Sequence, residues 1–263
     1  MKKDYTLNFL LVFLFFSYVI KAQEGIERQT TEQFQFWTSL NSTVRLSQHF
    51  GLIGDVHIRR ENFIKDPNFY FLRLGGVYWV NNQFSFVGGT AALWNATETN
   101  IGTKYALERR IYQQVLWRAV FGQLTFLQRI RTEQRWHQVL NSTDGSVDRV
   151  RFSNRFRFLM SASMQVFNKP TLPRPTISNE ILFHTGKEIV YNTFDQNRLF
   201  LGFNQQIGKN LRVDYGYMMV YQQQYAAREY NLNHTFRLFF YYSPDFRKES
   251  DENLPHYPIG GIE

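Results

Sequence analysis

Long runs in which apolar and polar residues alternate constrain the fold of this chain more than any other feature. In residues 123–137 the charged side chains share one parity, whereas Leu124, Phe126, Ile130 and Trp136 share the other. The same alternation recurs in residues 150–160, 196–206, 211–222 and 231–242. Because successive side chains of a β-strand point to opposite faces, this period of two predicts strands with one apolar and one polar face.

The length of the alternating segments favours a membrane barrel over a soluble sheet. Each runs for about 10–14 residues, whereas strands in globular sheets usually have about 5–6, and tilted strands that cross a bilayer need about 9–11. Short turns are expected near Ser47–His49, Asn81–Asn82, Phe121–Gln123 and Gly208–Asn210, and longer polar loops near 61–67, 95–105, 138–148, 186–195 and 224–230. Short turns at one end and longer loops at the other are typical of outer-membrane barrels.

The number of strands is the weakest part of this pattern. About eleven segments can be counted, yet single-chain bacterial barrels have even numbers of strands, so we expect ten or twelve. Either residues 24–33 contain a further strand, or one segment has been merged or split around the proline-rich stretch 168–175. The predicted fold is an all-β, transmembrane, antiparallel up-and-down β-barrel of about 10–12 strands.

The N-terminus has the features of a secretory signal peptide. Lys2 and Lys3 form a basic region, residues 7–20 are almost entirely apolar, and Ala22 suits the cleavage position. The apolar run is shorter than the roughly 20 residues that a spanning helix needs, which argues against a membrane anchor. We therefore expect a cleavable signal in residues 1–22, the barrel in 23–243 and a C-terminal tail in 244–263.

Composition excludes several other classes of protein. Aromatic residues make up 17% of the chain and charged residues 20%, with a mean hydropathy of −0.39, so a helical membrane protein is not expected. The absence of cysteine excludes disulfides, thiolate metal sites and cysteine nucleophiles. The net charge of +8 is spread along the predicted strands instead of forming a cluster, so nucleic-acid binding is not expected either.

Charged residues on the polar parity are the main candidates for a functional site. An Arg or Lys at the lipid midplane costs about 2–4 kcal/mol, so in a membrane barrel this parity must face the lumen. The predicted lumenal charge network consists of Arg129, Arg131, Glu133, Arg135, Arg155, Arg157, Glu180, Arg198, Asp214 and Arg237. Narrow barrels are usually filled by their own side chains, which favours a structural network. The excess of arginine leaves room for a small anionic ligand or for a small pore that selects anions.

Aromatic residues near the predicted strand ends fit the girdles that mark the two membrane interfaces. Ordinary packing inside a soluble barrel is the alternative interpretation. The residues concerned are Tyr78, Trp79, Trp94, Trp136, Tyr221 and Tyr242.

Several short motifs together resemble a known family. They are an early Trp37, the Arg-x-Arg-x-Glu-x-Arg run that starts at Arg129, the Arg-x-Arg pair that starts at Arg155, Asn179-Glu180, the run from Phe194 to Arg198, and Tyr217-Met218. On these motifs the chain resembles the bacterial outer-membrane proteins grouped as domain-of-unknown-function family 2490, over roughly residues 30–243. The resemblance implies an outer-membrane barrel with no assigned activity, and hence no functional residues to transfer. The proline-containing tail departs from the usual ending on an aromatic strand.

The histidines were considered for catalysis and metal binding. No two of them have a metal-ligand spacing, and neither a His-x-Ser pair nor a Gly-x-Ser-x-Gly elbow occurs. His184 beside Thr185, on the same parity as Glu180, is the only hint of a base and a nucleophile. We therefore expect no enzyme, no metal and no cofactor.

The sequence thus predicts an exported outer-membrane barrel, structural or forming a small pore, with outer-membrane lipids and lipopolysaccharide as its surroundings. Two alternatives from other classes remain. One is a soluble, lipocalin-like periplasmic binder, and the other is an outer-membrane enzyme that modifies lipids.

Overall fold

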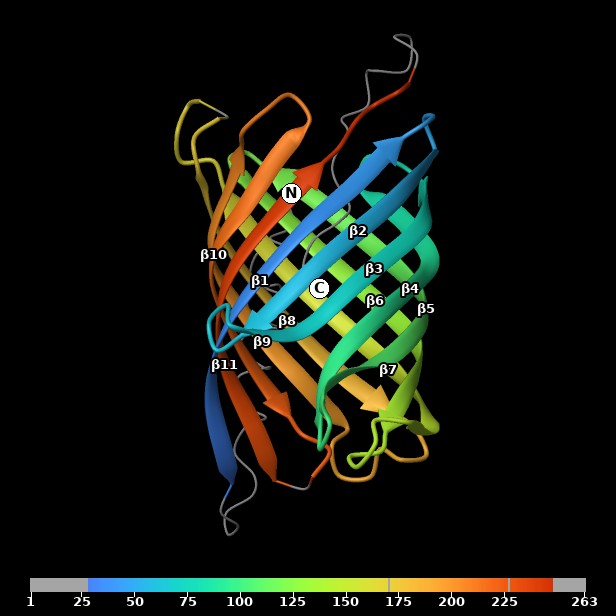
Figure 1. The fold of residues 1–263 in the computed structure, drawn as a ribbon. Coiled ribbons are helices and arrows are strands. Elements are labelled where there is room, and N and C mark those ends of the chain that lie inside the picture. The colour runs from blue at the N-terminus through green and yellow to red at the C-terminus, as the bar shows by residue number, and fades with distance from the viewer. Residues whose placement is uncertain (1–27, 170, 227, 248–263) are drawn as a thin grey trace, which may run out of the picture.

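The computed structural model describes residues 28–169, 171–226 and 228–247, which form a closed β-barrel of eleven strands (Figure 1). The predicted signal in residues 1–22 and residues 248–263 of the predicted tail lie outside the described residues. No helix in the described part of the chain is long and apolar enough to span a membrane. The strands are β1 (Gln29–Arg45), β2 (Phe50–Glu61), β3 (Asp66–Trp79), β4 (Phe84–Thr99), β5 (Gly102–Phe121), β6 (Leu124–Leu140), β7 (Val147–Met164), β8 (Arg174–Thr185), β9 (Phe194–Gln206), β10 (Leu211–Gln223) and β11 (Glu229–Tyr242).

Closure by a parallel pair of strands is the feature that the sequence did not predict. Consecutive strands pair antiparallel, but β1 runs parallel to β11 from Gln29↔Glu229 to Ser42↔Tyr242. In Figure 1 the blue β1 lies beside the red β11. An up-and-down barrel with an odd number of strands must close in this way, because its first and last strands point in the same direction. The expectation of ten or twelve strands is therefore wrong, while the all-β barrel is confirmed.

Loops at the two ends of the barrel follow most of the predicted pattern. The connections 46–49, 80–83, 122–123 and 207–210 lie at one end, which we call the turn end, and 62–65, 141–146, 186–193 and 224–228 lie at the other, the loop end. The loop predicted at 95–105 is only a turn at 100–101, because β4 and β5 stay paired as far as Thr99↔Gly102. The proline-rich connection 165–173 is a long loop at the turn end. After β11, Asp245 forms an isolated bridge with Arg45.

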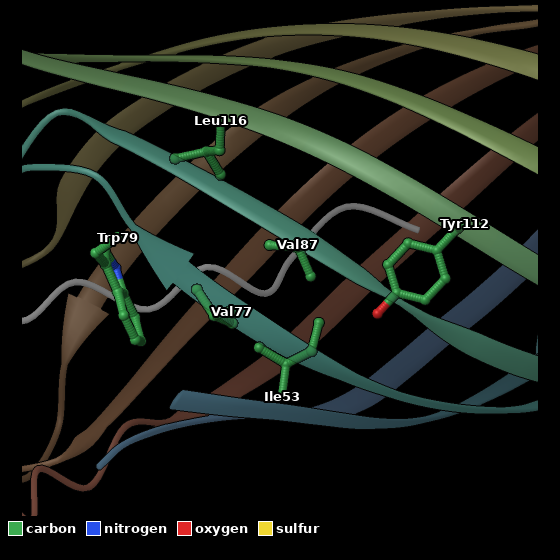
Figure 2. Close-up of a cluster of buried hydrophobic side chains, with 6 residues drawn as sticks. All are labelled: Ile53, Val77, Trp79, Val87, Tyr112 and Leu116. Carbon is green, nitrogen blue, oxygen red and sulfur yellow. The ribbon is translucent and has the colours of Figure 1, made fainter. Parts of the chain in front are cut away.

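Apolar side chains fill part of the barrel interior. One cluster projects inward from β2 to β5 near the turn end and contains Ile53, Val77, Trp79, Val87, Tyr112 and Leu116 (Figure 2). A second comes from β1 and β9 to β11 and contains Trp37, Phe200, Met218, Val220, Phe239 and Tyr241. The prediction of an interfacial Trp79 is wrong, because its side chain points inward. Tyr78, Trp94, Trp136 and Tyr242 are 37–46% exposed on strand segments near the barrel ends.

Glycines make room for the largest ring of the first cluster. Tyr112 is paired in register with Gly89, which is paired in turn with Gly75 on β3. A Cβ atom on either glycine would collide with the Tyr112 hydroxyl group and with the backbone of the neighbouring strand. The two glycines therefore let the phenol ring cross the inner wall of the barrel.

Candidate functional site

The predicted charge network faces the interior of the barrel. Its side chains come from β6 to β11, and the nine that are almost fully buried include Arg157, Glu180 and Arg237 at 0% exposure. On β6, Ile130 between Arg129 and Arg131 is 53% exposed on the outside. The assignment of the arginine parity to the interior is therefore confirmed, since strand alternation places neighbouring residues on opposite faces.

Glu180 is the carboxylate on which three strands converge. Arg157 donates two hydrogen bonds to it, each of 2.9 Å, in a bidentate arrangement. Arg129 donates from β6 at 2.6 Å, and Arg198 donates from β9 at 3.3 Å. Because these guanidinium groups reach from both sides of β8, the carboxylate links four neighbouring strands in the interior.

A second carboxylate, Glu133, lies next to this group. Arg155 donates to it at 2.5 and 2.8 Å, and Arg157 donates from its remaining nitrogen at 2.9 Å. Arg131 is within 3.6 Å. Arg157 thus connects Glu133 and Glu180, so these side chains form one ion-pair network.

Two carboxylates of the network were not among the predicted site residues. Glu108 on β5 accepts hydrogen bonds from Arg110 at 2.5 Å and from Arg135 at 2.9 and 3.0 Å. Asp195, at the start of β9, lies 3.3 Å from Arg155 and 3.9 Å from Arg135. Glu108 could have been predicted, because it shares one parity with Arg110, Tyr112 and Gln114. Asp195 lies within the run from Phe194 to Arg198, which was used only for the family resemblance.

The remaining predicted pair occupies a different part of the interior. Arg237 on β11 lies 3.3 Å from Asp214 on β10 and also donates to the Tyr241 hydroxyl at 3.1 Å. Its guanidinium stacks on the rings of Phe200 and Phe239 at 4.3 and 4.4 Å. A buried Asp55–Arg73 ion pair on β2 and β3 was also not predicted. The interior charges therefore form a main network on β5 to β9 and separate pairs elsewhere.

Contacts between side chains of non-adjacent strands fill a further part of the interior, beside the main network. The ring of Trp37 on β1 contacts the guanidinium groups of Arg59 and Arg198, which lie 3.3 and 5.4 Å from the ring centre. His57 on β2 makes edge contacts with Phe71 and with Phe239 of β11. These residues come from β1, β2, β3, β9 and β11, so side chains fill the interior along this part of the barrel.

A cavity of about 370 Å³ lies above this filled section, at the loop end. Arg155, Arg157 and Arg198 of the main network line it, together with Trp37 and with Tyr225 of the last loop. Tyr225 is 42% exposed and has the guanidinium of Arg151 at 3.7 Å from its ring centre. The cavity is therefore a polar chamber between the ion-pair network and the loops.

His184 and Thr185, the candidate base and nucleophile, do not form a catalytic arrangement. His184 is buried and faces the cavity, with its Nε2 atom 2.5 Å from the carbonyl oxygen of Asn192. Thr185 is the adjacent strand residue and is exposed on the opposite face. In the part of the chain that the structure describes, no group of three His, Asp or Glu residues is placed to hold a metal ion.

A comparison with protein families agrees with the resemblance noted in the sequence. A family model described as "Protein of unknown function (DUF2490)" matches residues 34–247. No curated protein and no solved structure matches the chain significantly. The family match runs from within β1 to the residues after β11, so it includes every residue of the charge network.

Proposed function

This chain belongs to the DUF2490 family, and we propose that it is an outer-membrane protein whose filled barrel spans the lipid bilayer. Its role in this proposal is structural and non-enzymatic, without a cofactor. Export depends on the predicted signal peptide, and outer-membrane lipids and lipopolysaccharide surround the outer wall.

The outward-facing apolar side chains carry this proposal. Every strand contributes at least one large apolar residue that is 43–58% exposed, so the band continues around the whole barrel. One from each strand, in order, is Leu40, Leu52, Leu74, Phe86, Ile111, Ile130, Phe158, Ile177, Leu201, Tyr217 and Phe236. Soluble monomers rarely expose contiguous apolar patches beyond a few hundred Å². A lipid surrounding accounts for such a band, because strands of membrane barrels alternate apolar outward and polar inward.

The filled interior favours a structural barrel over an open pore. Arg129, Arg131, Arg157 and Glu180 are at most 1% exposed inside the barrel. Charge-assisted, partly bidentate hydrogen bonds hold these side chains in place, so opening a channel would break several of them at once. A small anion-selective pore is the second candidate, and the arginine-lined cavity at the loop end is the observation that favours it.

The two other candidate functions have less support. A lipocalin-like soluble binder would place the apolar band in water, at a large cost in hydration free energy. A lipid-modifying enzyme needs a base and a nucleophile within hydrogen-bond reach, whereas His184 and Thr185 face opposite sides of β8.

Cell fractionation and gel mobility test the membrane proposal. We expect the protein in the outer-membrane fraction, with unheated samples migrating differently from heated ones because the barrel resists detergent. A soluble protein without a mobility shift would contradict it.

Planar-bilayer conductance tests whether the barrel is filled. We expect no steady conductance for the wild-type protein. The variants Arg131→Ala and Arg155→Ala, which remove side chains of the main ion-pair network, are compared with the wild type. Steady channels in the wild type that both substitutions alter would assign the pore function instead.

A further inference from the structure

The cavity at the loop end has an unusual charge balance. Seven arginines line it, against the three carboxylates Glu61, Glu108 and Asp195. Including Glu133 and Glu180 below, with Arg129 and Arg131, the balance is nine arginines to five carboxylates. Buried charge without full compensation is costly, so the chamber attracts an anion. The planar guanidinium fork matches carboxylate and phosphate groups in particular.

Two buried polar atoms on the wall indicate that the guest also donates hydrogen bonds. The Oδ1 atom of Asn233 and the Nδ1 atom of His184 have no hydrogen-bond partner among the described residues. Both residues line the cavity and are 3% and 2% exposed. Since the Nε2 atom of His184 donates to the Asn192 carbonyl, its Nδ1 atom is an acceptor, as is Asn233 Oδ1. An anion that only accepts hydrogen bonds would leave both unsatisfied.

The rest of the lining suits a ligand with several hydroxyl groups. Ten amide side chains contribute, among them Gln33, Asn68 and Asn231. Each amide offers donors and an acceptor, which is what a hydroxyl group requires. The volume of about 370 Å³ is near the lower end of the roughly 300–1,000 Å³ range of small-molecule sites.

We propose that this cavity binds an acidic sugar, a saccharide unit that carries a carboxylate or phosphate group. The arginines bind the anionic group, and Asn233, His184 and the amides bind the hydroxyls. An acidic peptide is less suitable, because peptides commonly add to a free strand edge and every strand of this closed barrel is already paired on both sides. The inference rests on the proposed function for its setting: outer-membrane barrels have their longer loops on the extracellular side, so the cavity at the loop end faces the cell exterior.

Titration calorimetry on the folded, detergent-solubilised mature protein tests the proposal. The probes are glucuronate, glucose 6-phosphate, neutral glucose, inorganic phosphate and a glutamate-rich tripeptide. We expect at least one acidic sugar to bind about tenfold or more tightly than glucose and than phosphate, which corresponds to about 1.4 kcal/mol. The comparison of glucuronate with glucose 6-phosphate distinguishes a carboxylate from a phosphate ligand.

Matched variants on β7 locate the binding site. Arg151 lines the cavity, whereas Arg149 is exposed and pairs with Asp148 and Glu188 outside it. We expect Arg151→Gln to weaken acidic-sugar binding about tenfold, the effect of one charge-assisted hydrogen bond. Arg149→Gln should leave it unchanged. Asn233→Leu, which removes the acceptor but keeps the number and branching of the side-chain heavy atoms, should reduce sugar binding while sparing any binding of inorganic phosphate.

Each contrary outcome has a defined meaning. If no acidic sugar binds to a barrel that retains its heat-modifiable mobility, the inference is overturned while the membrane proposal stands. Equal binding of phosphate and glucose 6-phosphate, or preferred binding of the tripeptide, also overturns it. A soluble protein that binds acidic sugars would instead contradict the membrane proposal and leave the cavity assignment intact.

Discussion

The interior of this barrel is filled in two different ways. Between β2 and β5, near the turn end, Ile53, Val77 and Leu116 pack around Trp79 and Tyr112 without ion pairs among them (Figure 2). Between β5 and β9 the barrel interior is instead occupied by arginines and carboxylates. Apolar packing depends on volume and tolerates small changes, whereas a buried ion-pair network depends on every charge having its partner. The two regions should therefore respond very differently to single substitutions.

Removing a carboxylate from the charged region should have the largest effect. Glu180→Gln leaves Arg129, Arg157 and Arg198 facing a neutral side chain. We expect a loss of about 3–5 kcal/mol in the free energy of unfolding, the cost of leaving buried charges uncompensated. Urea unfolding of the protein in lipid vesicles measures it.

The matched control is Glu188→Gln, at an exposed ion pair with Arg149. Its effect should stay below about 1 kcal/mol, because surface pairs contribute little. If the two glutamates had similar effects, the charged region would not be the more sensitive one.

Moving a charge to the outer face should have the next largest effect. Ile130→Arg places a guanidinium on the exposed side of β6, next to the inward Arg129 and Arg131. In a bilayer we expect a loss of about 2–4 kcal/mol in the free energy of unfolding. Urea unfolding of the variant and of the wild type in lipid vesicles measures this loss, and the yield of refolding into vesicles provides a second readout.

Val150→Arg, near the loop end of β7, is the control for this change. It should cost only about 0–1 kcal/mol, because charges near the membrane interface remain hydrated. No difference between the two positions would contradict a membrane-embedded outer wall.

The smallest effect is expected in the apolar region. Ile53→Val removes one methylene group from the cluster and should cost about 0.5–1.5 kcal/mol in the same unfolding measurement. The neighbouring Leu52, which is 53% exposed, serves as the control through Leu52→Val. A loss at Ile53 as large as that at Glu180 would remove the distinction between the regions.

Much of the site followed from strand alternation. The inward placement of Arg131, Glu133 and Arg155 needed only their parity and the cost of a charge in lipid. Glu108 was missed although its strand alternates equally well, and Asp195 was missed because it lies at a strand end, where alternation gives little information. Trp79 was assigned to the membrane interface because its position near a strand end does not distinguish the two faces.

By itself, the sequence determined where most of the strands lie and which parity is polar, because both depend on neighbours one or two positions away. Only the tertiary structure decided that eleven strands close through a parallel β1–β11 pair, and that Arg157 joins Glu133 to Glu180 while Arg237 joins Asp214. These features depend on register and closure among strands far apart in the chain. Local periodicity contains no information about either.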